Sequence, residues 1–224
     1  MSKTSTNPEA MASIRSDHNL YYLILLKMLA IKLNKPGEPA TRKLIRFLPF
    51  RDSSLARIFL RETELARLYF QSSPPLVFFS KPQKKYKSGD KTIFDVPESK
   101  AWDVYHVRHL EKSAGLNDKR ESDYTFHALL TRDQGLIQLM DLCPLRAVAV
   151  FKDQTPIVPV PQASLQTYLS PVEAEELFSV EANQSRLERR AEVRENIKAL
   201  TLEVERELAQ VAEVEPRTNQ EINQ

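Results

Sequence analysis

The pattern of apolar and polar residues predicts a long first helix behind a polar start. Residues 1–16 are mostly small or polar, with few large apolar groups, which is typical of a disordered segment. From Asp17 onward, apolar side chains occupy almost every position up to Leu33. A helix that is apolar on every side usually lies at the centre of a core or in a dimer interface, and we expect one of these places for this helix.

Two shorter helices and a hairpin are expected next. The segments 39–48 and 54–71 repeat apolar residues at intervals of three and four, which predicts two amphipathic helices. The runs LVFFS at 76–80 and TIFDV at 92–96 are rich in β-forming residues and predict two strands. The residues between these strands would then form a long, lysine-rich hairpin tip.

One more helix and two more strands are expected before the C-terminal part of the chain. Gly115 ends a helical pattern over 98–114. The runs 146–151 and 155–160 predict two short strands, and the prolines of the second place it at a sheet edge because proline cannot donate a ladder hydrogen bond. On the helix over 98–114, the inward side is expected to carry Trp102, Tyr105, His109 and Leu110.

The C-terminal part predicts a long amphipathic helix over 171–213, followed by a flexible tail over 214–224. Ser170-Pro171-Val172-Glu173 has the sequence of a capping box with proline in the first turn. A second box, Ser185 with Glu188, predicts that the helix restarts there. From Leu187 the apolar spacing is close to a heptad repeat, so both a coiled coil and packing onto the body remain open.

These elements predict an α+β protein that is predominantly α-helical. It would have an N-terminal helical unit, a small central β-containing region and a long C-terminal amphipathic helix. The expected organisation is a single core domain over 17–170, with a basic surface at 39–91, and the helix of 171–213 appended to it.

Composition excludes several kinds of site. The chain has 224 residues with only 4 glycines and 1 cysteine, so it has no glycine-rich phosphate loop and no intramolecular disulfide. Four histidines and one cysteine offer few ligands, and we expect neither a metal nor a cofactor. No hydrolase or zinc-protease motif is present, and we expect a protein that is not an enzyme.

The sequence predicts a cytoplasmic protein without a membrane span. Its longest apolar run, Leu20–Ala30, is shorter than the roughly 20 residues that a membrane-spanning helix needs. The polar residues before this run do not resemble a secretory signal.

The net charge of +2 hides an uneven distribution of charged side chains. Residues 39–91 carry 12 basic and 4 acidic side chains, whereas residues 171–224 carry 7 basic and 13 acidic ones. Several cations on one surface are what a nucleic-acid backbone needs for neutralisation. We therefore expect a DNA-binding protein, a transcriptional regulator acting as a homo-oligomer. Its candidate nucleic-acid-binding residues are Arg42, Lys43, Arg46, Arg57, Arg61, Lys81, Lys84, Lys85, Tyr86, Lys87 and Lys91.

Two DNA-reading arrangements fit the predicted elements. In a helix-turn-helix, the helix over 54–71 would present Ser54, Arg57 and Arg61 to the major groove. Alternatively, a strand over 91–96 followed by two helices resembles the element order of a ribbon-helix-helix protein. In that order the strand would enter the groove.

Two other functions remain open. The chain would also suit a non-enzymatic structural or adaptor component of a viral, phage, secretion or conjugation assembly, with residues 185–211 docking a protein partner. RNA binding is a third candidate, suggested by Tyr86 in its lysine-rich surroundings.

Overall fold

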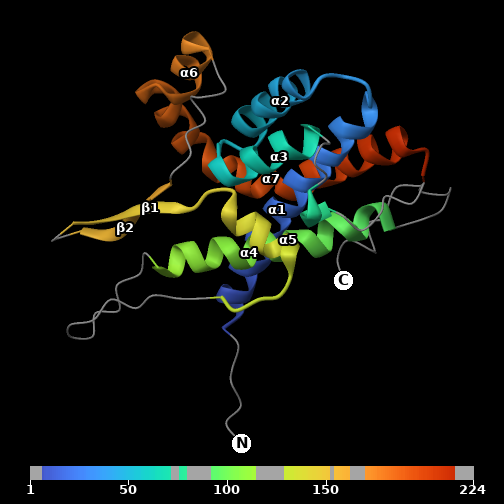
Figure 1. The fold of residues 1–224 in the computed structure, drawn as a ribbon. Helices are drawn as coiled ribbons and strands as arrows, with labels where there is room; N and C mark the ends of the chain where they lie inside the picture. The colour runs from blue at the N-terminus through green and yellow to red at the C-terminus, as the bar shows by residue number, and fades with distance from the viewer. Residues whose placement is uncertain are drawn as a thin grey trace, which may run out of the picture.

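The computed structural model describes residues 7–71, 76–79, 92–114, 129–151, 154–161 and 170–214. Figure 1 shows their arrangement, in which α-helices dominate. The prediction of a predominantly helical protein with a long C-terminal helix is confirmed. The seven α-helices of the described part are α1 (Pro8–Asn34), α2 (Ala40–Pro49), α3 (Leu60–Gln71), α4 (Thr92–Ala114), α5 (Gln134–Asp141), α6 (Pro171–Phe178) and α7 (Val180–Ala212).

Helix α1 forms the centre of the core, as its apolar pattern predicts. It packs against α2, α3, α4 and α7, and the side chains of Leu23, Ile24 and Leu26 are completely buried. The helix begins earlier than expected, because the Asn7 side chain accepts a hydrogen bond from the Glu9 backbone N–H at 3.0 Å and caps it. The prediction of disorder over 1–16 is therefore wrong from Pro8 onward.

The described residues also include one pair of β-strands. Strands β1 (Leu145–Phe151) and β2 (Gln154–Pro161) pair antiparallel, near the two stretches where the sequence predicts strands. Figure 1 shows this pair extending to one side of the helices.

The expected hairpin of strands at 76–80 and 92–96 is wrong. Val77–Phe79 forms a 3-10 turn, η2, and residues 92–96 form the start of α4. Ile93 and Phe94 are completely buried, and they continue into α4 an apolar pattern of helical spacing. Tertiary packing thus overrides the β propensity of a short run. Since this segment is helical, the ribbon-helix-helix arrangement is also wrong.

The expected helix-turn-helix does not form either. Helix α2 continues into a π-helical turn, η1 (Phe50–Ser54), and α3 begins only at Leu60. Between them Ala56 has φ of 46°, a left-handed conformation that a continuous α-helix cannot contain. Ser54, Arg57 and Arg61 therefore do not share one recognition helix.

Serine side chains cap the N-terminal ends of the two C-terminal helices, α6 and α7. Ser170 and Glu173 form the predicted capping box at the start of α6. The predicted restart at Ser185 is wrong, because Ser179 caps α7 and Ser185 lies inside it. The second half of α7 packs onto α1, where the Tyr22 hydroxyl donates to Glu205 Oε1 at 2.5 Å. The sequence left a coiled coil and packing onto the body open, and this half of α7 packs onto the body.

No helix in the described ranges has the length and apolar character needed to cross a membrane.

Candidate nucleic-acid interface

The predicted site residues do not form one surface. Arg42 is exposed on α2, and Arg46 is paired with Glu38. Lys43 is 2% exposed, and its Nζ donates to the Pro36 carbonyl at 3.1 Å, so the expectation that it faces solvent is wrong. Six of the predicted residues lie outside the part of the chain that the structure describes: Lys81, Lys84, Lys85, Tyr86, Lys87 and Lys91.

Arg61 belongs to the interior of the protein. Its side chain is 3% exposed and donates to the carbonyl groups of Leu139, Met140 and Cys143, with distances of 2.8 Å to Met140 and 3.1 Å to Cys143. It is also paired with Glu111. The guanidinium therefore caps the C-terminal end of α5, where backbone carbonyls lack helical partners. The expectation that Arg61 contacts a groove is wrong for this reason.

Arg57 is the predicted residue that joins a cationic surface. Burial lowers the pKa of its guanidinium, and the charges of Arg190 and Arg194 lower it further. Arg190 and Arg194 are exposed and lie one turn apart on the same side of α7. Among the described residues, none of these three guanidinium groups makes an ion pair. We call Arg57, Arg190 and Arg194 the arginine cluster.

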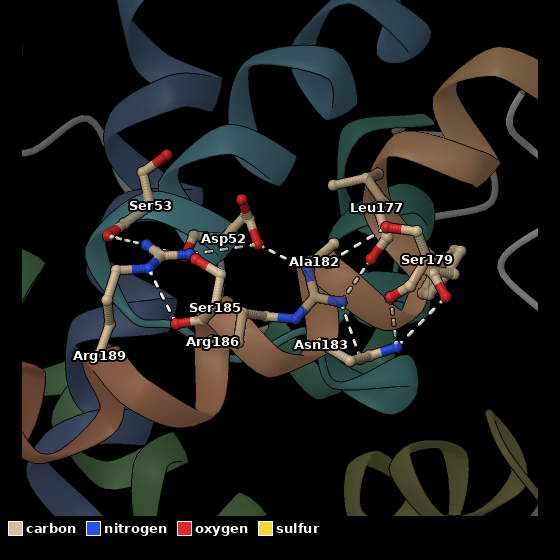
Figure 2. A network of polar contacts seen from close by, with 10 residues as sticks. Asp52, Ser53, Leu177, Ser179, Ala182, Asn183, Ser185, Arg186 and Arg189 are labelled. Carbon is tan, nitrogen blue, oxygen red and sulfur yellow. Dashed lines mark hydrogen bonds and ion pairs between the residues drawn. The ribbon is translucent and has the colours of Figure 1, made fainter.

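A polar network brings α7 to the segment that carries Arg57 (Figure 2). Arg186 Nη1 donates to Asp52 Oδ1 at 2.7 Å, and Arg189 Nη1 donates to the carbonyls of Asp52 and Ser53 at 3.1 Å each. Arg186 also donates to the Leu177 carbonyl at the end of α6. These hydrogen bonds attach the start of α7 to η1. They also bring Arg190, the residue after Arg189, near Arg57.

We expect Asp52→Ala to loosen this attachment. Arg186 is almost fully buried, so losing its carboxylate partner should lower the free energy of unfolding by about 1.5–3 kcal/mol, the usual value of a hydrogen bond to a charged group. Urea denaturation measures this loss, with the exposed Asp141→Ala as a control that should change stability by less than about 0.5 kcal/mol. Equal stability of the two variants would contradict the role given to Asp52.

A group of aromatic rings surrounds the exposed Trp102 of α4. Trp102 is 40% exposed and stacks on His18 of α1, with ring centroids 4.2 Å apart. Its ring also contacts those of Tyr105 and His106, and Tyr105 in turn stacks on His109 at 5.7 Å. We call these five residues the aromatic group.

The expected inward positions of α4 are partly wrong. Tyr105 is buried, but Trp102 and His109 are exposed and Leu110 is only partly buried. The smaller residues of α4 face α1 instead, because the close approach of two helices leaves little room for indole rings. The core-facing residues of this stretch include Ala101, Val104 and Val107.

The Asp17 carboxylate on α1 acts electrostatically on Tyr105 of the aromatic group and on Arg57 of the arginine cluster. Burial raises the pKa of the Tyr105 hydroxyl, and the Asp17 carboxylate raises it further. The same carboxylate acts on Arg57, where it partly opposes the effect of burial and of the neighbouring arginines. Tyr105 and Arg57 are therefore both within electrostatic reach of one residue on α1.

Sequence reasoning missed Arg190, Arg194 and the outward side of α4. The two arginines lie in the acidic C-terminal stretch 171–224, where alternating Arg and Glu residues usually form a solvated helix surface. Their proximity to Arg57 depends on a tertiary contact across more than half of the chain, which no local pattern indicates. Nothing in the described ranges gathers three or more His, Cys, Asp or Glu side chains in an arrangement that could hold a metal ion.

No family model, curated protein or solved structure matches the chain at a significant level.

Proposed function

We propose that this protein binds nucleic acid, with DNA as the favoured target, through the arginine cluster, in the role of a transcriptional regulator. The observation that supports this proposal is the electrostatic proximity of three guanidinium groups, none of which makes an ion pair among the described residues. Their mutual repulsion is relieved when an anion lies between them. A phosphate suits the place because guanidinium offers two parallel donors to its oxygens.

Neither groove-reading arrangement expected from the sequence is formed, so the proposed contact is with the phosphate backbone. Backbone contacts supply affinity without base sequence information. Arg42 is exposed and is available for a further phosphate contact, and the lysines between 81 and 91 stay predicted contacts.

The variant Arg190→Ala/Arg194→Ala tests the proposal. Because each phosphate contact contributes about one order of magnitude near 0.1 M salt, we expect roughly 10- to 100-fold weaker binding. Fluorescence anisotropy with labelled oligonucleotides at fixed salt measures the change. Arg206→Ala is a matched control, since Arg206 is an exposed arginine of the same helix about 18 Å along the axis from Arg194.

The control should bind as the unchanged protein does, and both variants should keep the thermal midpoint of the unchanged protein. If the double variant and the control bind with equal affinity, the arginine cluster does not hold phosphate and the proposal is wrong.

A second candidate function is that of a non-enzymatic adaptor in a macromolecular assembly. Residues 170–185 contain four carboxylates and no basic side chain. Val172 on α6 and Val180 on α7 are nonetheless largely exposed, Val180 by 79%. A basic amphipathic helix of a partner protein would match both the charge and the apolar side chains. Val180→Asp would abolish capture of such a partner but leave nucleic-acid affinity unchanged.

The expected α+β class and the expected self-association also stay proposals. The antiparallel register of β1 and β2 supports the first. The exposed Leu187, on the first half of the near-heptad spacing, supports the second. A mass measurement in solution with the unchanged protein and Leu187→Asp tests self-association, because loss of the larger species is expected only if this side of α7 is the contact.

A further inference from the structure

A groove lies between η1 and α7. It has a volume of about 390 Å³, and Ser53 and Ser54 form its η1 side. The remaining lining residues lie on one side of α7, between Arg189 and Glu203. This side differs from the one that packs onto the core, on which Ile197 is buried. The groove is therefore a surface of α7 that the core leaves uncovered in the described part of the chain.

The residues on the α7 side of the groove are placed symmetrically about Asn196. Arg189 and Glu203 lie seven residues before and after Asn196, and the apolar Val193 and Ala199 lie three residues before and after it. Steps of three, four and seven residues keep side chains on one side of a helix. The two ends, each about 10 Å from Asn196 along the axis, thus carry opposite charges, and the middle is apolar on both sides of the amide.

Both charged ends can form a further ion pair. Arg189 Nη1 donates to the carbonyls of Asp52 and Ser53, which holds the guanidinium at this end of the groove (Figure 2). Its Nη2 lies 3.9 Å from Asp52 Oδ1 and makes no hydrogen bond within the described part of the chain. Glu203 is exposed, and no ion pair among the described residues includes it. A positioned donor and an exposed carboxylate therefore lie at opposite ends of one surface.

We propose that this groove binds a second copy of the chain, with the two α7 helices antiparallel and Asn196 at the two-fold axis. The inference rests on the self-association proposed above and gives it a different contact from Leu187. A two-fold axis brings the same surface of both copies together, so that surface must complement itself. In this arrangement Arg189 of each copy faces Glu203 of the partner subunit, at both ends of the contact.

The middle of the contact also complements itself. Val193 of each copy meets Ala199 of the partner subunit, which pairs a large apolar side chain with a small one. Asn196 meets Asn196 of the partner subunit, and two amides on an axis can each donate to the other and accept from it. A parallel pair would instead place arginine beside arginine at one end and glutamate beside glutamate at the other, and like charges oppose such a pairing.

The antiparallel pairing leaves Arg190 and Arg194 of the arginine cluster uncovered. They lie six and two residues before Asn196, which at about 100° per residue places them about 120° and 160° around α7 from it. Both therefore face away from the second copy. A dimer of this kind presents two arginine clusters to nucleic acid without a change in either.

Charge reversal at the ends of the groove tests the antiparallel pairing. Sedimentation velocity of the full chain over a range of concentrations gives the monomer–dimer equilibrium. Glu203→Arg puts two guanidinium groups together at each end, so we expect a dissociation constant roughly 10- to 100-fold higher than that of the unchanged protein. Arg189→Glu puts two carboxylates together and should weaken the dimer in the same way.

A mixture of the two variants separates pairing from a merely structural effect. In a mixed dimer each arginine again faces a carboxylate, so the equimolar mixture should dimerise about as well as the unchanged protein although neither variant does so alone. A variant that fails because it is misfolded is not rescued by mixing. Glu195→Arg reverses the charge of an exposed α7 glutamate that does not line the groove, and this control should dimerise normally.

The possible failures are distinguishable. If Glu203→Arg dimerises as the unchanged protein does, or if mixing restores no dimer, the antiparallel contact is overturned. Loss of the dimer in Leu187→Asp together with normal dimerisation of Glu203→Arg assigns the contact to the other side of α7. If the unchanged protein is a monomer at every concentration, both self-association proposals fail. Nucleic-acid binding by the arginine cluster stands or fails separately, because its test measures affinity for an oligonucleotide.

Discussion

Arg61→Met is expected to lower the free energy of unfolding by about 3–5 kcal/mol, as is typical when one member of a buried polar network is removed. The Arg61 guanidinium is buried and holds three backbone carbonyls at the end of α5, besides its contact with Glu111. Methionine occupies similar space but donates no hydrogen bond, so these carbonyls would stay buried without a partner. Each such group costs about 1–3 kcal/mol.

Urea denaturation of the full chain measures this loss. Arg42→Met is the control, because Arg42 is an exposed arginine and its replacement should change stability by less than about 0.5 kcal/mol. The opposite pattern, with Arg61→Met stable but defective in nucleic-acid binding, would show that Arg61 is a surface contact after all.

Glu62→Gln should have an effect of similar size. Glu62 is 0% exposed, and its carboxylate accepts hydrogen bonds from Arg108 Nε at 2.8 Å and Nη2 at 2.7 Å. Arg51 is also fully buried and makes no guanidinium hydrogen bond within the described part of the chain, so it depends on the same negative charge. Removing that charge leaves the buried Arg51 without a compensating carboxylate and Arg108 with Glu111 as its remaining acidic partner, and we expect a loss of about 3–5 kcal/mol.

The acid limb of the stability curve tests the same carboxylate. Burial raises the pKa of Glu62, but the charge and hydrogen bonds of Arg108 and the charge of Arg51 together lower it below the ordinary value. A carboxyl with a lowered folded-state pKa stabilises the protein fully above its unfolded pKa of about 4.3 and loses that contribution as the pH falls through the folded pKa. Thermal midpoints between pH 7 and pH 3 should therefore fall less in Glu62→Gln than in the unchanged protein.

Exposed Glu188→Gln is the control for the pH series, and its curve should follow that of the unchanged protein. If Glu62→Gln and the unchanged protein lose stability in parallel as the pH falls, the carboxylate of Glu62 is not the group that titrates.

The parts of the fold that follow local rules could be predicted from the sequence. The all-round apolar pattern of α1 depends on its own residues, and it identifies a central helix whatever surrounds it. The capping box of Ser170 and Glu173 closes within four residues and forms as expected. The prediction of a strand at 92–96 was wrong because the run is short. Its conformation depends on the core in which Ile93 and Phe94 are buried.

The candidate site could not be predicted in the same way. The sequence does not show whether the side chain of a lysine or arginine is exposed to solvent or donates a hydrogen bond to a buried backbone carbonyl. Lys43 and Arg61 were therefore grouped with Arg42, although their partners place them inside. Arg190 lies within electrostatic reach of Arg57 because α7 is attached to η1, for example by the hydrogen bond between Arg186 and Asp52, which are 134 positions apart. Long-range geometry of this kind has no local signature.

The salt dependence of nucleic-acid affinity tests the arginine cluster most directly. Binding constants of the unchanged protein and Arg190→Ala/Arg194→Ala are measured from about 50 to 200 mM salt, and their logarithms are plotted against the logarithm of salt concentration. The slope of the double variant should be shallower by about 1.4 for a single strand or about 1.8 for a duplex, because two phosphate contacts are lost. Identical slopes for the two proteins would contradict phosphate binding by these arginines.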